Sequence, residues 1–232
     1  MRLQRLLLQD IRYQLTYGFY TVYALISAAY VGILRLLPDD MRTLGAAIII
    51  LTDPAALGFF FIGGIWLLEK GEGLHGLLSV LPVKPVEYVV SRLLSLALIS
   101  TLSGIVIVSA SGIPRIDCSL LCPVLVLGAG IFTLAGLTLA TRARTVNHYA
   151  MITIPAELLL IAPVGLIVSG IQSPLLNMLP GAQLYYGISA SMGLSSPMTT
   201  AGILVGLASW FLAALGIALR RVPTALRTGG MG

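Results

Sequence analysis

The sequence predicts an all-α integral membrane protein with six transmembrane helices, an N-terminal interfacial helix and short re-entrant external helices before the last span. Of its 232 residues, 57% are hydrophobic and 10% are charged, whereas a soluble domain carries about 25% charged residues. So little polar surface cannot cover a globule in water, and lipid is the expected surrounding. The apolar residues also form continuous runs, which favour helices over the alternating pattern of a barrel.

Six apolar runs can be located along the chain. A helix of about 20 residues crosses a hydrocarbon core of roughly 30 Å. The expected spans lie near residues 18–37, 44–68, 88–112, 119–140, 150–170 and 199–219. With short loops between most of them, residues 1–232 are expected to form one membrane domain.

Residues 1–17 have the pattern of an amphipathic helix. Apolar and polar side chains each recur at helical spacing on separate faces. The apolar positions are Leu3, Leu7, Ile11 and Leu15, and the polar positions are Arg2, Arg5, Gln9 and Arg12. We expect this helix to lie in the membrane interface; the alternative is a polar extension of the first span.

The basic residues predict the orientation. With a cytoplasmic N-terminus, only Arg35, Arg42 and Arg115 of the 14 Lys and Arg residues fall outside. Cytoplasmic loops carry such an excess of positive charge, so both termini are expected inside. The net charge of +5 is explained by topology, because the basic residues flank apolar segments, and we expect no nucleic-acid partner.

Two connecting segments are longer than the others. The cytoplasmic segment 69–87 begins with acidic residues and continues with an aliphatic patch; these are Glu69, Glu72, Leu74, Leu77, Leu78, Val80 and Leu81. Such a short amphipathic helix either docks into a groove on a cytoplasmic partner or lies on lipid headgroups. The external segment 171–198 is apolar but broken by Pro180 and Gly187, which predicts re-entrant or interfacial helices.

Two acidic residues, Asp53 and Glu157, fall inside spans. An ionised Asp near a helix centre costs about 2.5–3.5 kcal/mol on insertion scales, so both should face protein or water. They are expected at different depths and not to pair directly, and Pro54 is expected to kink the second span. They either line a translocation path and attract cationic groups on drugs, or serve the structure by capping and hydrogen bonding.

No catalytic or metal-binding motif is apparent. The sequence contains neither the phosphate-binding pattern GxxxxGK[ST] nor HExxH. His75 and His148 are expected to be solvated loop residues, and Cys118 and Cys122 small packing residues. We therefore expect no enzyme activity, no metal and no ATPase site in this chain.

The segment that starts at Glu69 resembles the loop of ABC-2-type transporter permeases. Those typically read E-x-x-x-G-T-x-x-x-L-x-x-x-P, followed by a stretch ending E-Y/I-x-x-x-K. Here Leu74 replaces the usual Thr and Arg92 the usual Lys. The strings in residues 10–20 and 53–63 are further similar to fluoroquinolone-export permeases.

This resemblance implies a division of labour. A second permease, identical or different, would pair with this chain, and each would dock on a separate ATP-binding cassette subunit that holds ATP and Mg. Leu74, Leu77, Leu78 and Leu81 would form the docking face, and Glu69 and Glu72 would contact the charged rim of that subunit. The cargo would be amphiphilic drugs or other hydrophobic compounds, exported across a prokaryotic plasma (inner) membrane. The alternatives are a membrane scaffold or assembly protein without a transport path and, less well supported, an intramembrane enzyme.

Overall fold

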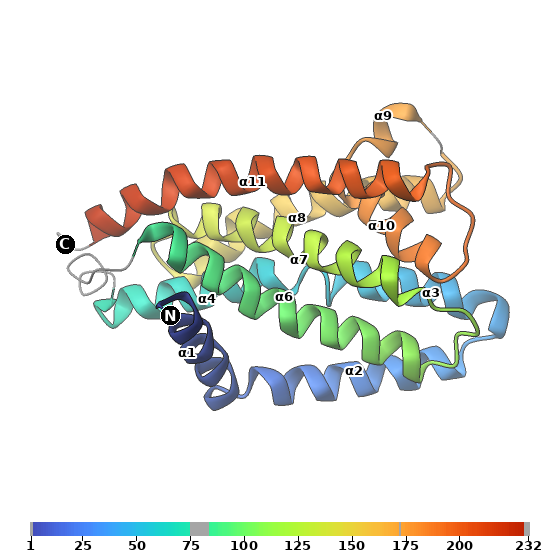
Figure 1. Ribbon diagram of the computed structural model, residues 1–232, viewed down its shortest axis with the longest axis horizontal. Coiled ribbons are helices and arrows are strands. Elements are labelled where there is room, and N and C mark those ends of the chain that lie inside the picture. The colour runs from blue at the N-terminus through green and yellow to red at the C-terminus, as the bar shows by residue number, and fades with distance from the viewer. Residues whose placement is uncertain (1, 75–83, 172, 230–232) are drawn as a thin grey trace.

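The computed structural model describes residues 2–74, 84–171 and 173–229, which form α-helices and short connections without a β-strand among them. Six stretches within these residues are long and apolar enough to cross a membrane, which confirms the predicted all-α fold with six spans. They are Phe19–Leu36, Asp39–Gly71, Pro85–Ala110, Cys118–Ala140, Val146–Val168 and Thr200–Leu226. Figure 1 shows the spans side by side along the long axis of the molecule.

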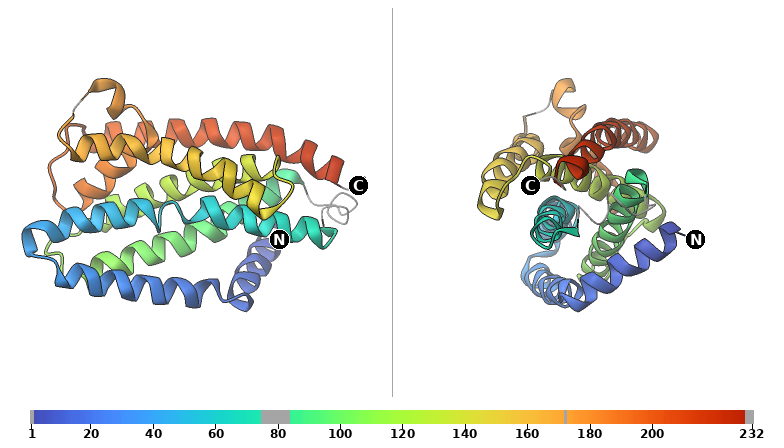
Figure 2. Two further views of the ribbon diagram at one scale, coloured as in Figure 1. Left: turned by 180° about the vertical axis from the view of Figure 1, so that it is seen from behind. Right: turned by 90° about the vertical axis from the view of Figure 1, so that its left-hand side faces the viewer.

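The N-terminal helix α1 (Arg2–Thr16) runs across one end of the bundle, whereas α2 (Phe19–Leu36) follows the long axis (Figures 1 and 2). Gly18 makes the corner between them with a φ of 75°, a left-handed conformation that side chains disfavour. The helix predicted in residues 1–17 is therefore present, and its position in the membrane interface stays a prediction.

The second span consists of two helices, α3 (Asp39–Thr52) and α4 (Leu57–Gly71). Pro54 has no N–H to donate to the carbonyl of Ile50, and the backbone N–H of Ala55 donates to it instead at 2.9 Å. The Ser100 hydroxyl of the third span donates to the carbonyl of Pro54 at 2.5 Å. The kink predicted at Pro54 is thus a complete break whose polar backbone groups find partners.

The fourth span α7 (Cys118–Ala140) lies at the centre of the bundle and packs against α4, α6 (Pro85–Ala110) and α11 (Thr200–Gly229). Gly136 permits the close approach to α4, since a Cβ atom there would lie 2.5 Å from the carbonyl oxygen of Phe59. Side chains of α7, among them Leu121, Leu125 and Leu134, are fully buried.

The fifth span α8 (Val146–Val168) is followed by the short helices α9 (Pro174–Asn177) and α10 (Pro180–Ser191). Helix α10 is buried along most of its length, among α3, α7, α8 and α11. Two short helices therefore occupy the segment predicted to be broken, and their re-entry into the membrane stays a prediction.

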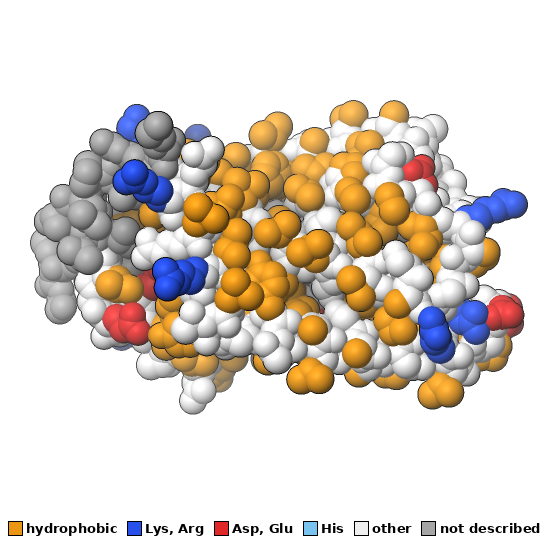
Figure 3. Space-filling model, turned by 60° about the horizontal axis from the view of Figure 1, so that its bottom comes forward, with side chains coloured by type: hydrophobic (Ala, Val, Ile, Leu, Met, Phe, Trp, Pro, Cys, Tyr) orange, Lys and Arg blue, Asp and Glu red, His pale blue; other side chains and the backbone are white. Residues whose placement is uncertain are grey.

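Charged groups gather at the two ends of the bundle. On the face drawn in Figure 3, hydrophobic side chains cover the middle, and Lys, Arg, Asp and Glu side chains lie toward the ends. Helix α1, the end of α4, the start of α6 and the C-terminal end of α11 all lie at one end (Figure 1). That arrangement agrees with an even number of spans, and the cytoplasmic assignment of this end stays a prediction.

Candidate functional site

The break between α3 and α4 places a carboxylate inside the bundle. Asp53 ends α3 and interacts electrostatically with Tyr30 of α2. Its Oδ2 atom is buried and has no hydrogen-bond partner in the described part of the chain. Because a buried, unpartnered carboxylate oxygen is costly, it marks Asp53 as a candidate for binding a cation or a hydrogen-bond donor.

Glu157 approaches the same region from α8. It is half-buried and interacts electrostatically with Asp53 and with Tyr149. The Tyr149 hydroxyl is buried and donates to the carbonyl of Phe59 on α4. Tyr149 thereby fixes α8 against α4 close to Glu157.

Glu157 lies further along its helix than the sequence predicts. The expected distance from the start of the span was about 10 Å. Helix α8 begins at Val146 instead of residue 150, so Glu157 lies about 16 Å along it at 1.5 Å per residue. The hydropathy of the chain does not predict this earlier start of α8, because the start depends on a helix cap. The Thr145 side chain accepts a hydrogen bond from the N–H of His148 at 3.2 Å.

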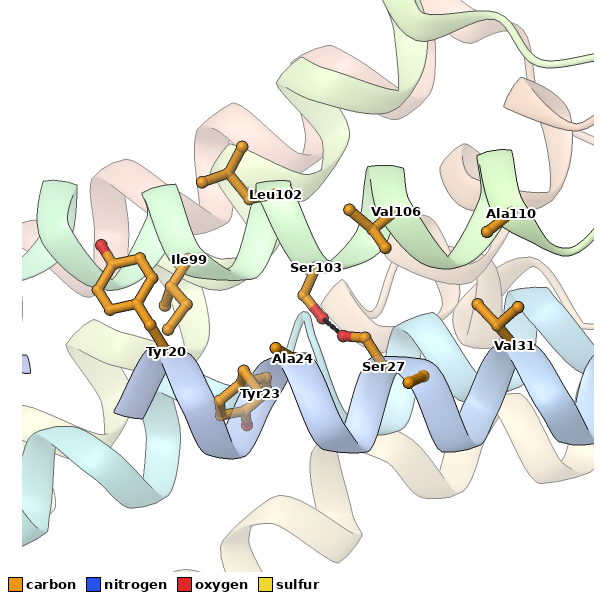
Figure 4. Close-up of a pocket in the computed structure, with 11 residues that line it drawn as sticks. Tyr20, Tyr23, Ala24, Ser27, Val31, Ile99, Leu102, Ser103, Val106 and Ala110 are labelled. Atoms are coloured by element: carbon orange, nitrogen blue, oxygen red, sulfur yellow. Dashed lines mark hydrogen bonds between the residues drawn. The ribbon is translucent and has the colours of Figure 1, made fainter. Parts of the chain in front are cut away.

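A crevice of about 450 Å³ lies between α2 and α6 (Figure 4). Its lining is apolar except for the hydroxyl groups of two tyrosines, Tyr20 and Tyr23, and two serines. Ser27 and Ser103 bridge the two helices with a hydrogen bond of 2.7 Å. Tyr23 also interacts electrostatically with Asp53, so the crevice adjoins the acidic region. A volume of this size falls in the range of pockets for small molecules.

A second, more apolar cavity of about 330 Å³ lies on the other side of α4, between α7, α8 and α11. Phe59 and Leu134 form part of its wall, and Ala156 and Leu160 contribute from the same stretch of α8 as Glu157. Asp53 is thus linked to the first cavity through Tyr23, and Glu157 follows Ala156 of the second; apolar cavities near acidic groups suit a ligand with one cationic group and a hydrophobic body.

A buried ionic cluster joins three helices at the end of the bundle that carries α1. Arg92 of α6 forms ion pairs with Asp10 of α1, at 3.0 Å, and with Glu69 of α4. The Tyr88 hydroxyl donates to Glu69 at 2.6 Å, and the Ser91 hydroxyl donates to Asp10 at 2.5 Å. The side chains of Asp10, Glu69 and Arg92 are each exposed by 9% or less.

The cluster also determines which face of α1 is buried. Gln14 donates to the Ser95 hydroxyl at 2.9 Å, one helical turn along from the Asp10 contact. Burial raises the pKa of Asp10 above its ordinary value, and the charge of Arg92 and the hydrogen bond from Ser91 oppose that rise. Leu15, expected on the apolar face, is exposed instead, because Asp10 and Gln14 find polar partners on α6.

The predicted coupling residues differ in their burial. Glu69 is buried and binds Arg92 and Tyr88, and its contact with the charged rim of a partner stays a prediction. Glu72 is exposed where α4 ends, and Leu74 is half-buried. Leu77, Leu78 and Leu81 lie outside the described residues.

Helix α1 also approaches Glu72. Burial raises the pKa of Tyr13 to about 12, with further contributions from the neighbouring Tyr17 and from the charges of Glu72 and Glu69. The N-terminal helix therefore lies within electrostatic reach of the base of the predicted coupling segment and takes part in the ionic cluster.

Asp10 is the functional candidate that the sequence analysis missed. From the sequence, a single acidic residue in a basic amphipathic helix is interpreted as a solvated side chain. The available signal was its place between Leu6 and Gln14 on one helix face. Only the packing of α1 on α6 reveals that Asp10 and Arg92 meet.

Six apolar helices, with charges at the ends and few polar groups inside, define a multi-pass α-helical membrane protein. The chain is similar to the fluoroquinolones export permease protein of Mycobacterium tuberculosis, in strains CDC 1551 / Oshkosh and ATCC 25618 / H37Rv. The identity is 26% over 154 residues, which are 65% of this chain and 64% of each relative. No family model matches the chain.

Proposed function

We propose that this chain is the membrane-spanning permease subunit of an ATP-driven ABC exporter that moves hydrophobic, amphiphilic drugs out of a prokaryotic cell. The observation that carries the proposal is its similarity to the fluoroquinolones export permease over 65% of its length. The six-span bundle gives that similarity a physical basis, since a permease needs a path through the membrane.

The proposed driving force comes from a separate ATP-binding cassette subunit, which would hold ATP and Mg. Its docking site on this chain would be the segment 69–87, with Glu72 and Leu74 at its base and Leu77, Leu78 and Leu81 along its apolar face. Glu69 would act from inside the bundle, because its carboxylate is buried and paired with Arg92. The permease would work as a dimer with an identical or a different permease, with both termini in the cytoplasm.

The proposed path for the cargo passes Asp53 and Glu157. An ionised carboxylate in a low-dielectric interior attracts a cationic group strongly. The adjoining cavities of about 450 Å³ and 330 Å³ would accept the hydrophobic body of the same molecule. This combination accounts for acidic residues inside otherwise apolar spans.

The partner is tested by co-purification from the native cell. The unmodified chain should retain a nucleotide-binding ATPase, and Leu78→Asp should release it, because an ionised Asp cannot remain in an apolar groove. Leu175→Asp is the matched control, since Leu175 is 76% exposed on α9 at the other end of the bundle. A chain that never retains an ATPase would instead support a membrane scaffold.

The cargo path is tested by export of a cationic amphiphilic dye from cells. Asp53→Asn and Glu157→Gln should each reduce export by about tenfold, which corresponds to about 1.4 kcal/mol of lost attraction. Asp40→Asn is the control, because Asp40 is exposed at the start of α3. Undiminished export in both interior variants would assign Asp53 and Glu157 a structural role.

A further inference from the structure

The outward face of α1 carries leucine and arginine side chains together. Leu8 is 67% exposed and Leu15 is 56% exposed, and Arg5 and Arg12 are exposed as well. The steps of three, four and three residues from position 5 to position 15 place all four on one side of a helix. We call these four residues the arginine–leucine face.

This face cannot turn inward, because contacts on the opposite side fix the rotation of α1. Asp10 is paired with Arg92 at 3.0 Å, and Gln14 donates to Ser95 at 2.9 Å. Both partners belong to α6, one of the six spans. The arginine–leucine face therefore points away from α6 and toward whatever surrounds the bundle.

The surroundings expected at this place are the boundary between lipid and water, as the amphipathic pattern of residues 1–17 predicts. Helix α1 runs across the bundle axis (Figure 2) and is followed within three residues by the span α2. At that depth, leucines can enter the acyl region while arginines reach the phosphate groups. Leucines that are more than half exposed would have no such apolar surroundings in the cytosol.

We infer that the arginine–leucine face binds anionic phospholipids of the leaflet next to α1. A guanidinium group donates two parallel hydrogen bonds to a phosphate, which favours arginine for this contact. Anionic headgroups are preferred over zwitterionic ones because the latter carry their own ammonium charge. Each basic residue near an anionic surface contributes about fivefold in affinity, so the two arginines together give about 25-fold.

Retention of lipids by the purified chain measures this preference. The chain is extracted from nanodiscs with equal amounts of phosphatidylglycerol and phosphatidylcholine, and bound lipids are counted by native mass spectrometry. The unmodified chain should retain phosphatidylglycerol in excess. Equal retention of the two lipids would overturn the inference.

The matched variants locate the binding. Arg5→Gln/Arg12→Gln should lower the excess of phosphatidylglycerol by tenfold or more. Arg142→Gln/Arg144→Gln removes the same charge from exposed positions in the turn between α7 and α8 and should leave it nearly unchanged. An equal loss in both variants would show a general charge effect and would also overturn the proposed site.

The depth of the leucines is measured independently of charge. Leu8→Trp should be quenched by phosphatidylglycerol brominated in its acyl chains, after subtraction of the signal from Trp66 and Trp210. Quenching should fall when Arg5 and Arg12 are also replaced. A Trp at position 8 that is quenched only by a water-soluble quencher would show that this face contacts the cytosol.

Discussion

Arg92 contacts two acidic side chains that come from different helices, Asp10 of α1 and Glu69 of α4. A buried ion pair seldom stabilises a fold beyond well-packed apolar residues, because desolvation offsets the attraction. Removal of one partner is different, since it leaves uncompensated charge. The cluster therefore makes Arg92 a major determinant of how α1 packs, beside the hydrogen bond from Gln14 to Ser95.

Replacement of this residue should be severe. Arg92→Gln leaves two buried acidic groups without a cation and should lower the free energy of unfolding by about 3–5 kcal/mol. Thermal unfolding of the detergent-purified chain measures the loss. Arg144→Gln, at an exposed position, should melt like the unmodified chain, and Arg92→Gln/Glu69→Gln/Asp10→Asn should recover part of the stability. Normal melting of Arg92→Gln would show that the cluster is not ionised.

A second prediction concerns Ser100, whose hydroxyl donates to the carbonyl of Pro54 at the break in the second span. Ser100→Ala leaves a buried carbonyl without that donor and should cost about 1–3 kcal/mol. Ser209→Ala is the control, because Ser209 is exposed and bonds only within its own helix. Equal melting temperatures for the two variants would mean that the break has another stabilising contact.

At the scale of elements, α10 depends on how closely it approaches α8. A Cβ atom at Gly181 would overlap the backbone carbonyl oxygen of Leu160, whereas a Cβ atom at Gly165 would meet nothing. The first glycine therefore determines the packing of two helices, and the second does not. Pro180 at the first turn of α10 fixes where this close approach begins.

The two glycines should respond oppositely to alanine. Gly181→Ala must push α10 away from α8 and should cost about 1–3 kcal/mol, as overpacking does in other cores. Gly165→Ala, in the interior of α8, should be neutral or stabilising by up to about 1 kcal/mol, because alanine is the better helix former. The same melting experiment compares them, and a stable Gly181→Ala chain would contradict the described contact.

The elements also show how far the sequence predicts the structure. Continuous apolar runs predicted the six spans, with each boundary within seven residues of the structure, since lipid imposes both length and composition on them. Pro54 gave the position of the break in the second span. Contacts between residues far apart in the sequence were not predictable. The sequence around Asp10 does not show that it pairs with Arg92. Glu69 has the sequence context of a surface residue, and only the packing of α6 beside it shows that it is buried.

At the scale of the molecule, the orientation is the main prediction still to be measured. Single cysteines are placed in a chain with Cys118→Ser/Cys122→Ser. Glu72→Cys and Arg144→Cys should react with a membrane-impermeant thiol reagent only after the cells are opened. Asp40→Cys and Arg115→Cys should react in intact cells, because they lie at the other end of the bundle. The reverse pattern would invert the topology and place the coupling segment outside the cell.

The central place of α7 has a consequence for biosynthesis. Its neighbours α4 and α6 emerge from the ribosome before it, and α10 and α11 emerge after it. The early spans consequently enter the bilayer without the helix that fills the space between them. A nascent chain ending near residue 117 should remain protease-sensitive and dependent on the insertion machinery, and protection should appear once the stretch 118–140 has been inserted.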